Sequence, residues 1–137
     1  MLSILKPCPS MLATTASCLL VAASLLLSSG VSAHAGEADV IQVRSTQASD
    51  GTWRFDVTVR HADDGWAHYA DSFEILAPDK SVLGTRVLLH PHVTEQPFTR
   101  SIDGVVIPRD IRQVIVRAHD KVHGYGGEEQ TVELPLD

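Results

Sequence analysis

The stretch from Thr52 to Arg60, TWRFDVTVR, decides the fold because apolar and polar residues alternate along it without interruption. Successive side chains of a β-strand point to opposite faces, so this alternation predicts a strand with one face buried in a core. The apolar members of the alternation are Trp53, Phe55, Val57 and Val59.

The rest of the domain consists of similar short segments bounded by turn residues. Further strands are predicted at 38–44, 69–77, 82–89, 98–102, 112–118 and 131–134, with a short piece at 105–107. The turn sequences between them include Ser49-Asp50-Gly51, Pro78-Asp79-Lys80 and Asp103-Gly104. About seven short strands without a helical pattern predict an all-β fold, an antiparallel β-sandwich like those of immunoglobulin and fibronectin-III domains.

The direction of the strands predicts where their connections lie. If each strand reverses the one before it, the turns at 46–51, 78–81 and 108–111 share one end of the sandwich. The loops at 61–68, 90–96 and 119–128 then share the other end. Every histidine after residue 34 belongs to this second set: His61, His68, His90, His92, His119 and His123.

Residues 1–33 are predicted to be a secretory signal peptide. Lys6 precedes an apolar run at 11–27, and Val31-Ser32-Ala33 is a typical cleavage sequence. The run is short and rich in Ala, Ser and Thr, which favours removal over an uncleaved membrane anchor. Residues 34–137 are therefore expected to form one periplasmic or secreted domain with no stable membrane insertion after cleavage. Cleavage after Ala33 would leave His34 as the first residue, whereas cleavage after Ala35 would leave Gly36.

Composition limits the ligands that the domain can offer. Cys8 and Cys18 both lie in the leader, so the exported chain has neither a disulfide nor a thiolate. Nitrogen and oxygen donors favour zinc, copper or nickel. The 17 acidic and 10 basic side chains after the leader give a net charge of −7, which argues against nucleic acid and anionic membrane surfaces as partners.

The loop at 61–68 combines two imidazoles with two carboxylates. His61 continues the inward parity of the preceding strand, so we expect it at the rim of the core. It is a candidate metal ligand together with His68, with Asp63 as an outer partner or oxygen ligand. The alternative is a rim histidine bonded to a loop carbonyl, with Asp63-Asp64-Gly65 as an ordinary turn.

The sequence His90-Pro91-His92 places two imidazoles two residues apart on an extended segment, because proline keeps the preceding residue out of the helical region. Residues with this spacing face the same way and can meet one metal ion. The alternative is that Pro91 ends a strand and both rings are solvated. Glu95 is a further oxygen donor nearby, and Arg100 could hold an acidic group or structure the loop.

The third histidine pair, His119 and His123, flanks Asp120, whose carboxylate could hold a ring nitrogen of either one. The sequence Gly124-Tyr125-Gly126-Gly127 then predicts a loop, and its glycines can bring the backbone close to a ligand or partner. The alternative is a mobile loop with Tyr125 on its surface.

An exported β-sandwich with a candidate N-terminal His34 and a later Asp120 and His123 loosely resembles the periplasmic copper-resistance carriers (CopC-like). The resemblance implies an immunoglobulin-like sandwich that binds copper(II) through these three residues. The chain differs from that family in its other histidine pairs and in having no methionine after Met11. The segments HPHVTEQPFTR and VHGYGG also look like those of an uncharacterised group of exported bacterial proteins, which implies no activity.

Two main functional hypotheses follow. The first is a domain that binds zinc or copper(II) for storage, delivery or structural closure. Its expected ligands are His90 and His92, with one or two of His61, His68, His119 and His123, and with Asp63, Asp120 or Glu95 in support. The second is a non-enzymatic interaction module that binds an envelope protein or a glycan through the same loops, with Trp66, Tyr69 and Tyr125 as anchors.

Two further readings use the same histidines. A zinc-bound water held by three of them would make an enzyme, but the sequence names no catalytic residue and no substrate. Alternatively, joint protonation of the imidazoles near neutral pH would make the loop end a pH sensor.

Overall fold

The computed structural model describes residues 36–135, which form seven β-strands and no helix. The predicted leader, both cleavage sites and His34 lie outside the described residues. The strands are β1 (Asp39–Gln47), β2 (Trp53–Arg60), β3 (Ala70–Leu76), β4 (Val82–Val87), β5 (Phe98–Val105), β6 (Gln113–Asp120) and β7 (Gln130–Glu133).

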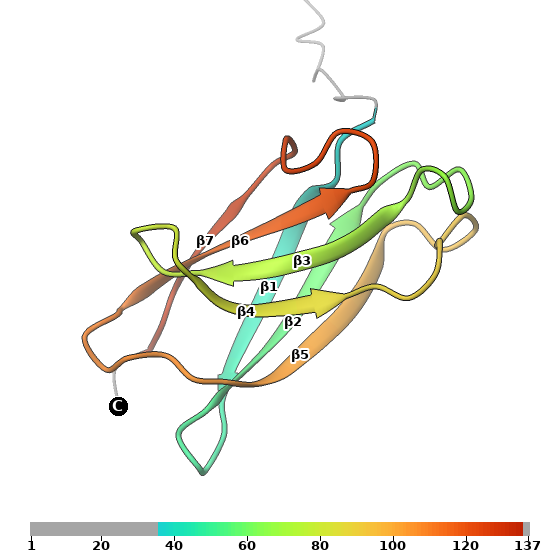
Figure 1. The fold of residues 1–137 in the computed structure, drawn as a ribbon. Helices are drawn as coiled ribbons and strands as arrows, with labels where there is room; N and C mark the ends of the chain where they lie inside the picture. Colours follow the sequence, from blue (N-terminus) through green and yellow to red (C-terminus); the bar gives the residue numbers. More distant parts are fainter. Residues whose placement is uncertain (1–35, 136–137) are drawn as a thin grey trace, which may run out of the picture. The chain divides into compact units, whose positions relative to one another are not determined.

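The strands form two antiparallel sheets that face each other (Figure 1). One sheet has the order β1-β2-β5 and the other β4-β3-β6-β7. The predicted all-β sandwich is confirmed. Because β4 joins the sheet of β3, β6 and β7, the strands divide three and four as in fibronectin-III domains. In constant-type immunoglobulin domains the fourth strand lies in the sheet of the first two strands instead.

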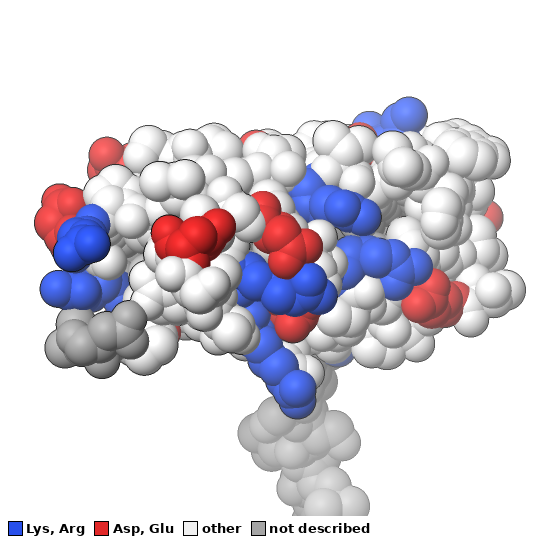
Figure 2. Space-filling view, turned by 90° about the horizontal axis from the view of Figure 1, so that it is seen from below, with Lys and Arg blue, Asp and Glu red and all other residues white. Residues whose placement is uncertain are grey.

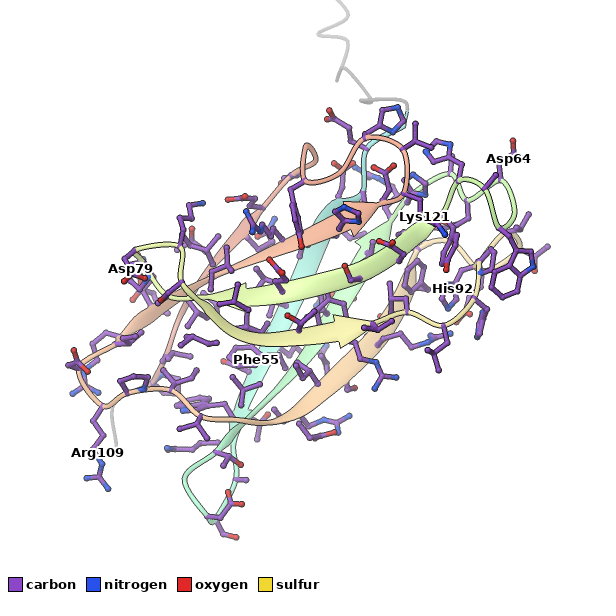
Figure 3. The ribbon with its side chains drawn as sticks, viewed as in Figure 1. Phe55, Asp64, Asp79, His92, Arg109 and Lys121 are labelled. Carbon is purple, nitrogen blue, oxygen red and sulfur yellow. The ribbon has the colours of Figure 1, made fainter. Side chains whose placement is uncertain are left out.

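The core fills the space between the sheets with the alternate side chains that the sequence pattern indicates. Along β2 the buried positions are those of Trp53, Phe55, Val57 and Val59, while intervening residues are exposed or half-buried. Phe55 lies near the middle of this layer (Figure 3) and contributes to one cluster with Phe73 and Phe98. Burial of such aromatic side chains is the main favourable term in folding a domain of this size.

The connections gather at two ends of the sandwich as the strand directions predict. In Figure 3, Asp64, His92 and Lys121 mark the loops at one end, and Asp79 and Arg109 mark the turns at the other. The start of β1 belongs to the first end, because the backbone N–H of Val40 donates to the carbonyl of Glu128 in the β6–β7 loop. All histidines among residues 36–135 therefore belong to the loop end.

Several strand boundaries differ from the sequence prediction: β1 runs on to Gln47, β4 ends at Val87, and the ends of β5 and β6 bear on the loops. Asp103-Gly104 does not end a strand: β5 runs through it to Val105. The register skips there, with Trp53 opposite Val105 and Phe55 opposite Ile102, so the two residues form a β-bulge with Gly104 at a φ of 68°. At the end of β6, His119 and Asp120 belong to the strand rather than to the loop that was expected to begin at 119, because Ser72 and Ala70 of β3 pair with them.

The molecular surface mixes charges of both signs. On the face shown in Figure 2, basic and acidic side chains lie next to one another instead of forming a patch of a single sign. On the outer side of β2, for example, Arg54 forms ion pairs with Asp56 and Asp103. Exposed pairs of this kind contribute little to stability, so the apolar core is the main stabilising element.

We expect Phe55→Ala to lower the free energy of unfolding by about 3–5 kcal/mol, because it leaves a cavity between the sheets. Val106→Ala is the matched control at an exposed side chain and should change stability by about 0.5 kcal/mol or less. Urea unfolding of both variants with a chelator present would measure the difference. Equal, small effects would contradict the position of the core.

Candidate metal centre

His61 follows directly after β2 and keeps the inward parity of that strand. Its side chain is fully buried, as the alternation along 53–59 predicts. Its Nδ1 atom lies 2.6 Å from Oδ1 of Asp63. Because a carboxylate can only accept in such a contact, Nδ1 of His61 donates to Asp63, which in the neutral ring leaves the lone pair on Nε2.

The Asp63 carboxylate is also fully buried and accepts three hydrogen bonds. Its Oδ1 atom accepts from His61 and from the backbone N–H of Ala70 at 3.1 Å. Its Oδ2 atom accepts from the backbone N–H of His92 at 2.6 Å. A buried charge needs such partners, and these three also join the β2–β3 loop to β3 and to the β4–β5 loop.

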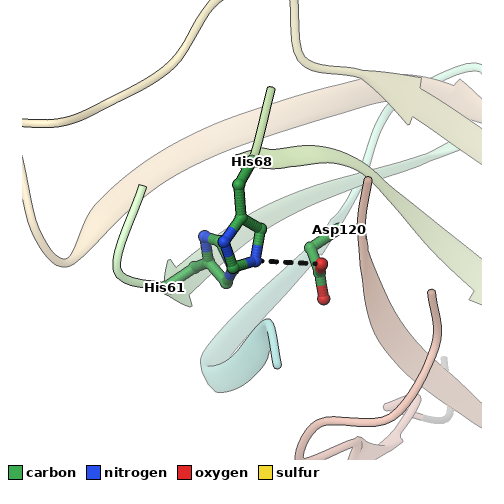
Figure 4. A group of neighbouring side chains, drawn as sticks. All are labelled: His61, His68 and Asp120. Atoms are coloured by element: carbon green, nitrogen blue, oxygen red, sulfur yellow. Dashed lines mark hydrogen bonds and ion pairs between the residues drawn. The ribbon is translucent and has the colours of Figure 1, made fainter. Parts of the chain in front are cut away.

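His68 brings a second imidazole to the first. Its Nε2 atom lies 3.2 Å from Nε2 of His61, and the two rings meet edge to face. Nε2 of His68 also lies 3.3 Å from Oδ1 of Asp120 (Figure 4). Two ring nitrogens facing each other beside a carboxylate can share a proton or hold a metal ion.

Asp120 ends β6, and its side chain is fully buried. Burial by itself raises the pKa of Asp120, but backbone N–H donors of His123 and Val122, at 2.8 and 2.9 Å from Oδ1, more than offset this and lower it overall. The carboxylate is therefore ionised at neutral pH. Its Oδ2 atom has no hydrogen-bond partner within residues 36–135. A buried carboxylate oxygen without a partner is costly and is a natural ligand for a cation.

Two further groups lie beside the side chains of His61, His68 and Asp120. His123 places Nδ1 at 3.1 Å from Oδ1 of Asp120, and its ring is tilted against that of His68. The carbonyl oxygen of Gly36, just before β1, lies 3.1 Å from Nε2 of His61 and 3.3 Å from Nε2 of His68. The cluster therefore lies where the β2–β3 loop, the end of β6 and the segment before β1 meet.

One group of side chains that could hold a metal ion is found in the part of the chain that the structure describes. It consists of His61, His68 and Asp120, whose ligand atoms all lie within 4.8 Å of one another (Figure 4). Of the six histidines named from the sequence, the structure thus brings together His61 and His68, with His123 beside them. We call the set His61, His68 and Asp120 the HHD cluster.

His90 and His92 lie apart from the HHD cluster. His90 is exposed, whereas His92 is buried and stacks on Phe98, with ring centroids 3.9 Å apart. Neither ring nitrogen of His92 has a hydrogen-bond partner in the described range. Burial, and then the charges of Arg100 and His90, lower the pKa of His92, so its ring is neutral at neutral pH.

The β4–β5 loop nevertheless supports His61 through its backbone and one amide side chain. Oε1 of Gln96 accepts the backbone N–H of His61 at 3.0 Å, and Nε2 of Gln96 donates to the carbonyl of His92. Sequence reasoning missed Gln96, and it also missed the carbonyl of Gly36. Every residue has a backbone carbonyl, so the sequence does not indicate which one lies at the site. The amide of a loop glutamine can bond to many groups, so the sequence does not indicate the partners of Gln96 either.

His119 points to the outer face of the β4-β3-β6-β7 sheet, because neighbours along a strand alternate and Asp120 points inward. Its Nδ1 atom lies 2.6 Å from Oδ1 of Asp71, and its ring meets Tyr125 edge to face. The guanidinium of Arg117 lies 3.8 Å from the centre of the Tyr125 ring. These residues form a polar group on the outer face that is separate from the HHD cluster.

The remaining residues named from the sequence lie around the loop end. Glu95 and Arg100 form an ion pair with each other at 3.0 Å, and hydrogen bonding to Arg100 lowers the pKa of Glu95. Trp66 is 67% exposed and meets the largely buried Tyr69 edge to face. Nζ of Lys121 lies 5.4 Å from the centre of the Tyr69 ring.

Comparison with known proteins gives one relevant similarity. The chain is 43% identical over 99 residues to a protein of Halomicrobium mukohataei described as "Putative lipoprotein", a match that covers 71% of this chain and 47% of that protein. The chain thus spans about half the length of the curated relative it matches. No protein-family model and no solved structure matches the chain. Within residues 36–135 there is no helix that could cross a membrane.

We expect His92→Phe to remove part of the loss of stability that acid causes. Because the folded-state pKa of His92 lies below its usual 6.5, the unfolded chain takes up the proton more readily. The stability contributed by the neutral ring is therefore complete above pH 6.5 and falls as the pH drops below it.

Phenylalanine keeps the stacking on Phe98 and takes no proton. The gain in unfolding free energy of the variant over the parent should therefore be larger at about pH 5.5 than at about pH 8. Urea unfolding with a chelator present would measure both differences. The same difference at the two pH values would contradict the assignment.

Proposed function

We propose that this protein is an exported β-sandwich that binds one divalent transition-metal ion, zinc or copper(II), through His61, His68 and Asp120. The observation that carries the proposal is the HHD cluster itself, in which two imidazoles and a buried carboxylate lie together; Oδ1 of that carboxylate contacts His68, and Oδ2 has no hydrogen-bond partner in the described range. Imidazole nitrogen and carboxylate oxygen suit both metals, and the exported chain offers no thiolate.

The spacing of the ligand atoms supports a small ion. Metal–ligand bonds of about 2.0–2.1 Å in tetrahedral geometry place neighbouring ligand atoms about 3.3 Å apart. Two of the three separations are close to this value: the two Nε2 atoms are 3.2 Å apart, and Nε2 of His68 is 3.3 Å from Oδ1 of Asp120, while all three ligand atoms lie within 4.8 Å of one another. An ion bound here would take the place of the direct contact between the two rings.

The outer partners are those that metal-bound histidines usually have. The contact between Asp63 and Nδ1 of His61 selects the tautomer with a free Nε2 atom and increases the basicity of that nitrogen. His123 and the backbone N–H groups of residues 122 and 123 hold Asp120 in the same way. Because these contacts fix the ligands in place, they favour tight binding of the metal ion, for storage, delivery or closure of the loop end.

Export is supported by the leader-like residues 1–33 and by the similarity to a protein described as a lipoprotein. Both support the proposal that the domain works in the cell envelope or outside the cell, as a periplasmic or secreted protein. Such a compartment offers metal ions without the competition of cytosolic thiols.

His34 would be an additional ligand if the leader is cut after Ala33. Only Ala35 separates it from Gly36, and two residues span at most about 7 Å. Its amine and ring would then be available as ligands and would favour copper(II), as the resemblance to the copper carriers implies. Removal of the leader after Ala35 would instead leave the HHD cluster to act without it.

We expect His68→Ala to weaken zinc and copper(II) binding by more than the about 10–100-fold that loss of an outer partner costs, because it removes a direct ligand. His90→Ala is the matched control: it deletes an exposed imidazole at the same end of the fold and should leave affinity unchanged. Competition titration against a chromophoric chelator would measure both.

Native mass spectrometry of the untagged protein from its exporting host would complete the test. One bound zinc or copper ion per chain in the parent and none in His68→Ala is the expected result. Equal loss of metal in His90→Ala and His68→Ala would contradict the HHD cluster. A parent that stays metal-free throughout titration would refute the function.

A second function has one specific observation in its favour, the exposed apolar side chains at the loop end. Trp66 stands out of the β2–β3 loop, and Leu89 and Val93 of the β4–β5 loop are 76% and 56% exposed. Exposed aromatic and aliphatic groups on loops commonly anchor a partner, which for an exported domain would be an envelope protein or a glycan.

For this second function we expect Trp66→Ala to abolish co-purification of a partner from the exporting host while leaving metal binding intact. Val106→Ala, which removes an exposed apolar group from the connection between β5 and β6, is the control. Crosslinking followed by pull-down would measure recovery. Unchanged recovery with Trp66→Ala would contradict the interaction surface.

A further inference from the structure

The backbone carbonyl of Gly36 lies unusually close to the HHD cluster for a group outside it. The carbonyl oxygen is 3.1 Å from Nε2 of His61 and 3.3 Å from Nε2 of His68. These separations match the His61–His68 and His68–Asp120 separations, and they match the about 3.3 Å expected between ligands of one tetrahedral ion. Both imidazole nitrogens thus converge on the same oxygen.

We propose that the carbonyl oxygen of Gly36 is the fourth ligand of the metal ion, so that binding of the ion fastens the segment before β1 to the loop end. The inference rests on the proposed function and names a ligand that the side-chain chemistry does not reveal. Oxygen donors from the backbone serve as additional ligands beside imidazoles in some transition-metal sites, including blue-copper sites. The resulting set is two nitrogens and two oxygens.

The local conformation explains why a glycine occupies this position. Gly36 has a φ of 125°, which side chains other than glycine rarely allow. A Cβ atom built on Gly36 would lie 2.6 Å from Cε1 of His123, which is closer than real carbon atoms approach. The chain therefore passes close to the His123 ring, and the carbonyl of Gly36 lies 3.1 and 3.3 Å from Nε2 of His61 and His68.

The neighbouring contacts hold the segment in place after it leaves the site. The N–H of Glu128 donates to Oδ1 of Asp39 at 2.9 Å, and the N–H of Val40 donates to the carbonyl of Glu128. These bonds fasten residues 39–40 to the β6–β7 loop whether or not metal is bound. Gly36 precedes them, and its carbonyl oxygen contacts the two imidazoles.

Carbonyl 13C NMR of the protein labelled at glycine carbonyls tests the ligand directly. The Gly36 resonance is identified as the one missing from the spectrum of Gly36→Ala. On addition of zinc to the parent, we expect this resonance to shift more than any other glycine carbonyl. Hydrogen exchange at residues 36–38 should slow with zinc, whereas exchange in β5 should not change.

Affinity gives the second readout. Gly36→Ala should weaken zinc binding by about tenfold or more, because the altered φ turns the carbonyl away. Gly51→Ala is the matched control: Gly51 also has a positive φ, of 85°, but nothing lies within 4 Å of its built Cβ atom in the β1–β2 turn. Its zinc affinity should equal that of the parent.

The outcomes separate this inference from the proposed function. If zinc shifts the ring signals of His61 and His68 but leaves the Gly36 carbonyl and its exchange unchanged, the carbonyl is not a ligand and the metal site stands. If Gly36→Ala binds zinc as tightly as Gly51→Ala, the inference is likewise overturned. If zinc shifts none of these signals in the parent and titration shows no copper(II) binding either, the proposed function itself fails.

Discussion

A carboxylate that is completely buried at one end of a sandwich has to be surrounded by donors, and the donors around Asp63 come from three separate segments. They are the ring of His61, the backbone N–H of Ala70 at the start of β3 and the backbone N–H of His92. Removing any one of them would leave a buried charge with too few partners. The positions of the β2–β3 and β4–β5 loops therefore depend on this single side chain, and so does the orientation of His61.

Asp120 is the second fully buried carboxylate of the loop end, and it belongs to the β4-β3-β6-β7 sheet. It ends β6, accepts backbone N–H groups from the turn that follows, and faces His68 across the opening between the sheets. Asp63 thus orients His61 through its Nδ1 atom, while Asp120 contacts His68 at its Nε2 atom. An ion bound between them would join the β2–β3 loop to the end of β6, a connection that an exported domain without cysteines cannot make by a disulfide.

Several features of the site could be predicted from the sequence. The period of two along β2 predicted the burial of His61, and strand reversal predicted that the three histidine loops share one end. The choice among the histidines could not be predicted. His90 and His92 looked like the best pair because of the intervening proline, yet His92 packs on Phe98 and His90 is left exposed. Phe98 lies on another strand, and nothing near His92 in the sequence indicates that contact.

The pair His119 and Asp120 shows the same limit in a different way. As neighbours in the sequence they looked equally close to a site in a loop. The structure places both in β6, whose pleat directs His119 to the outer face and Asp120 to the inner one. Only pairing with β3, which extends β6 to residue 120, determines which of the two reaches the HHD cluster.

The sequence by itself determined the class of fold, the buried faces of the strands and the end of the sandwich at which histidines gather. These are local properties, because alternation and turn residues act over a few positions. Only the tertiary structure decided that His61, His68 and Asp120 converge and that a backbone carbonyl from Gly36 meets them. Such distances depend on how the two sheets pack and on which loop groups donate hydrogen bonds to the buried carboxylates. Those donors come from segments that are far apart in the chain.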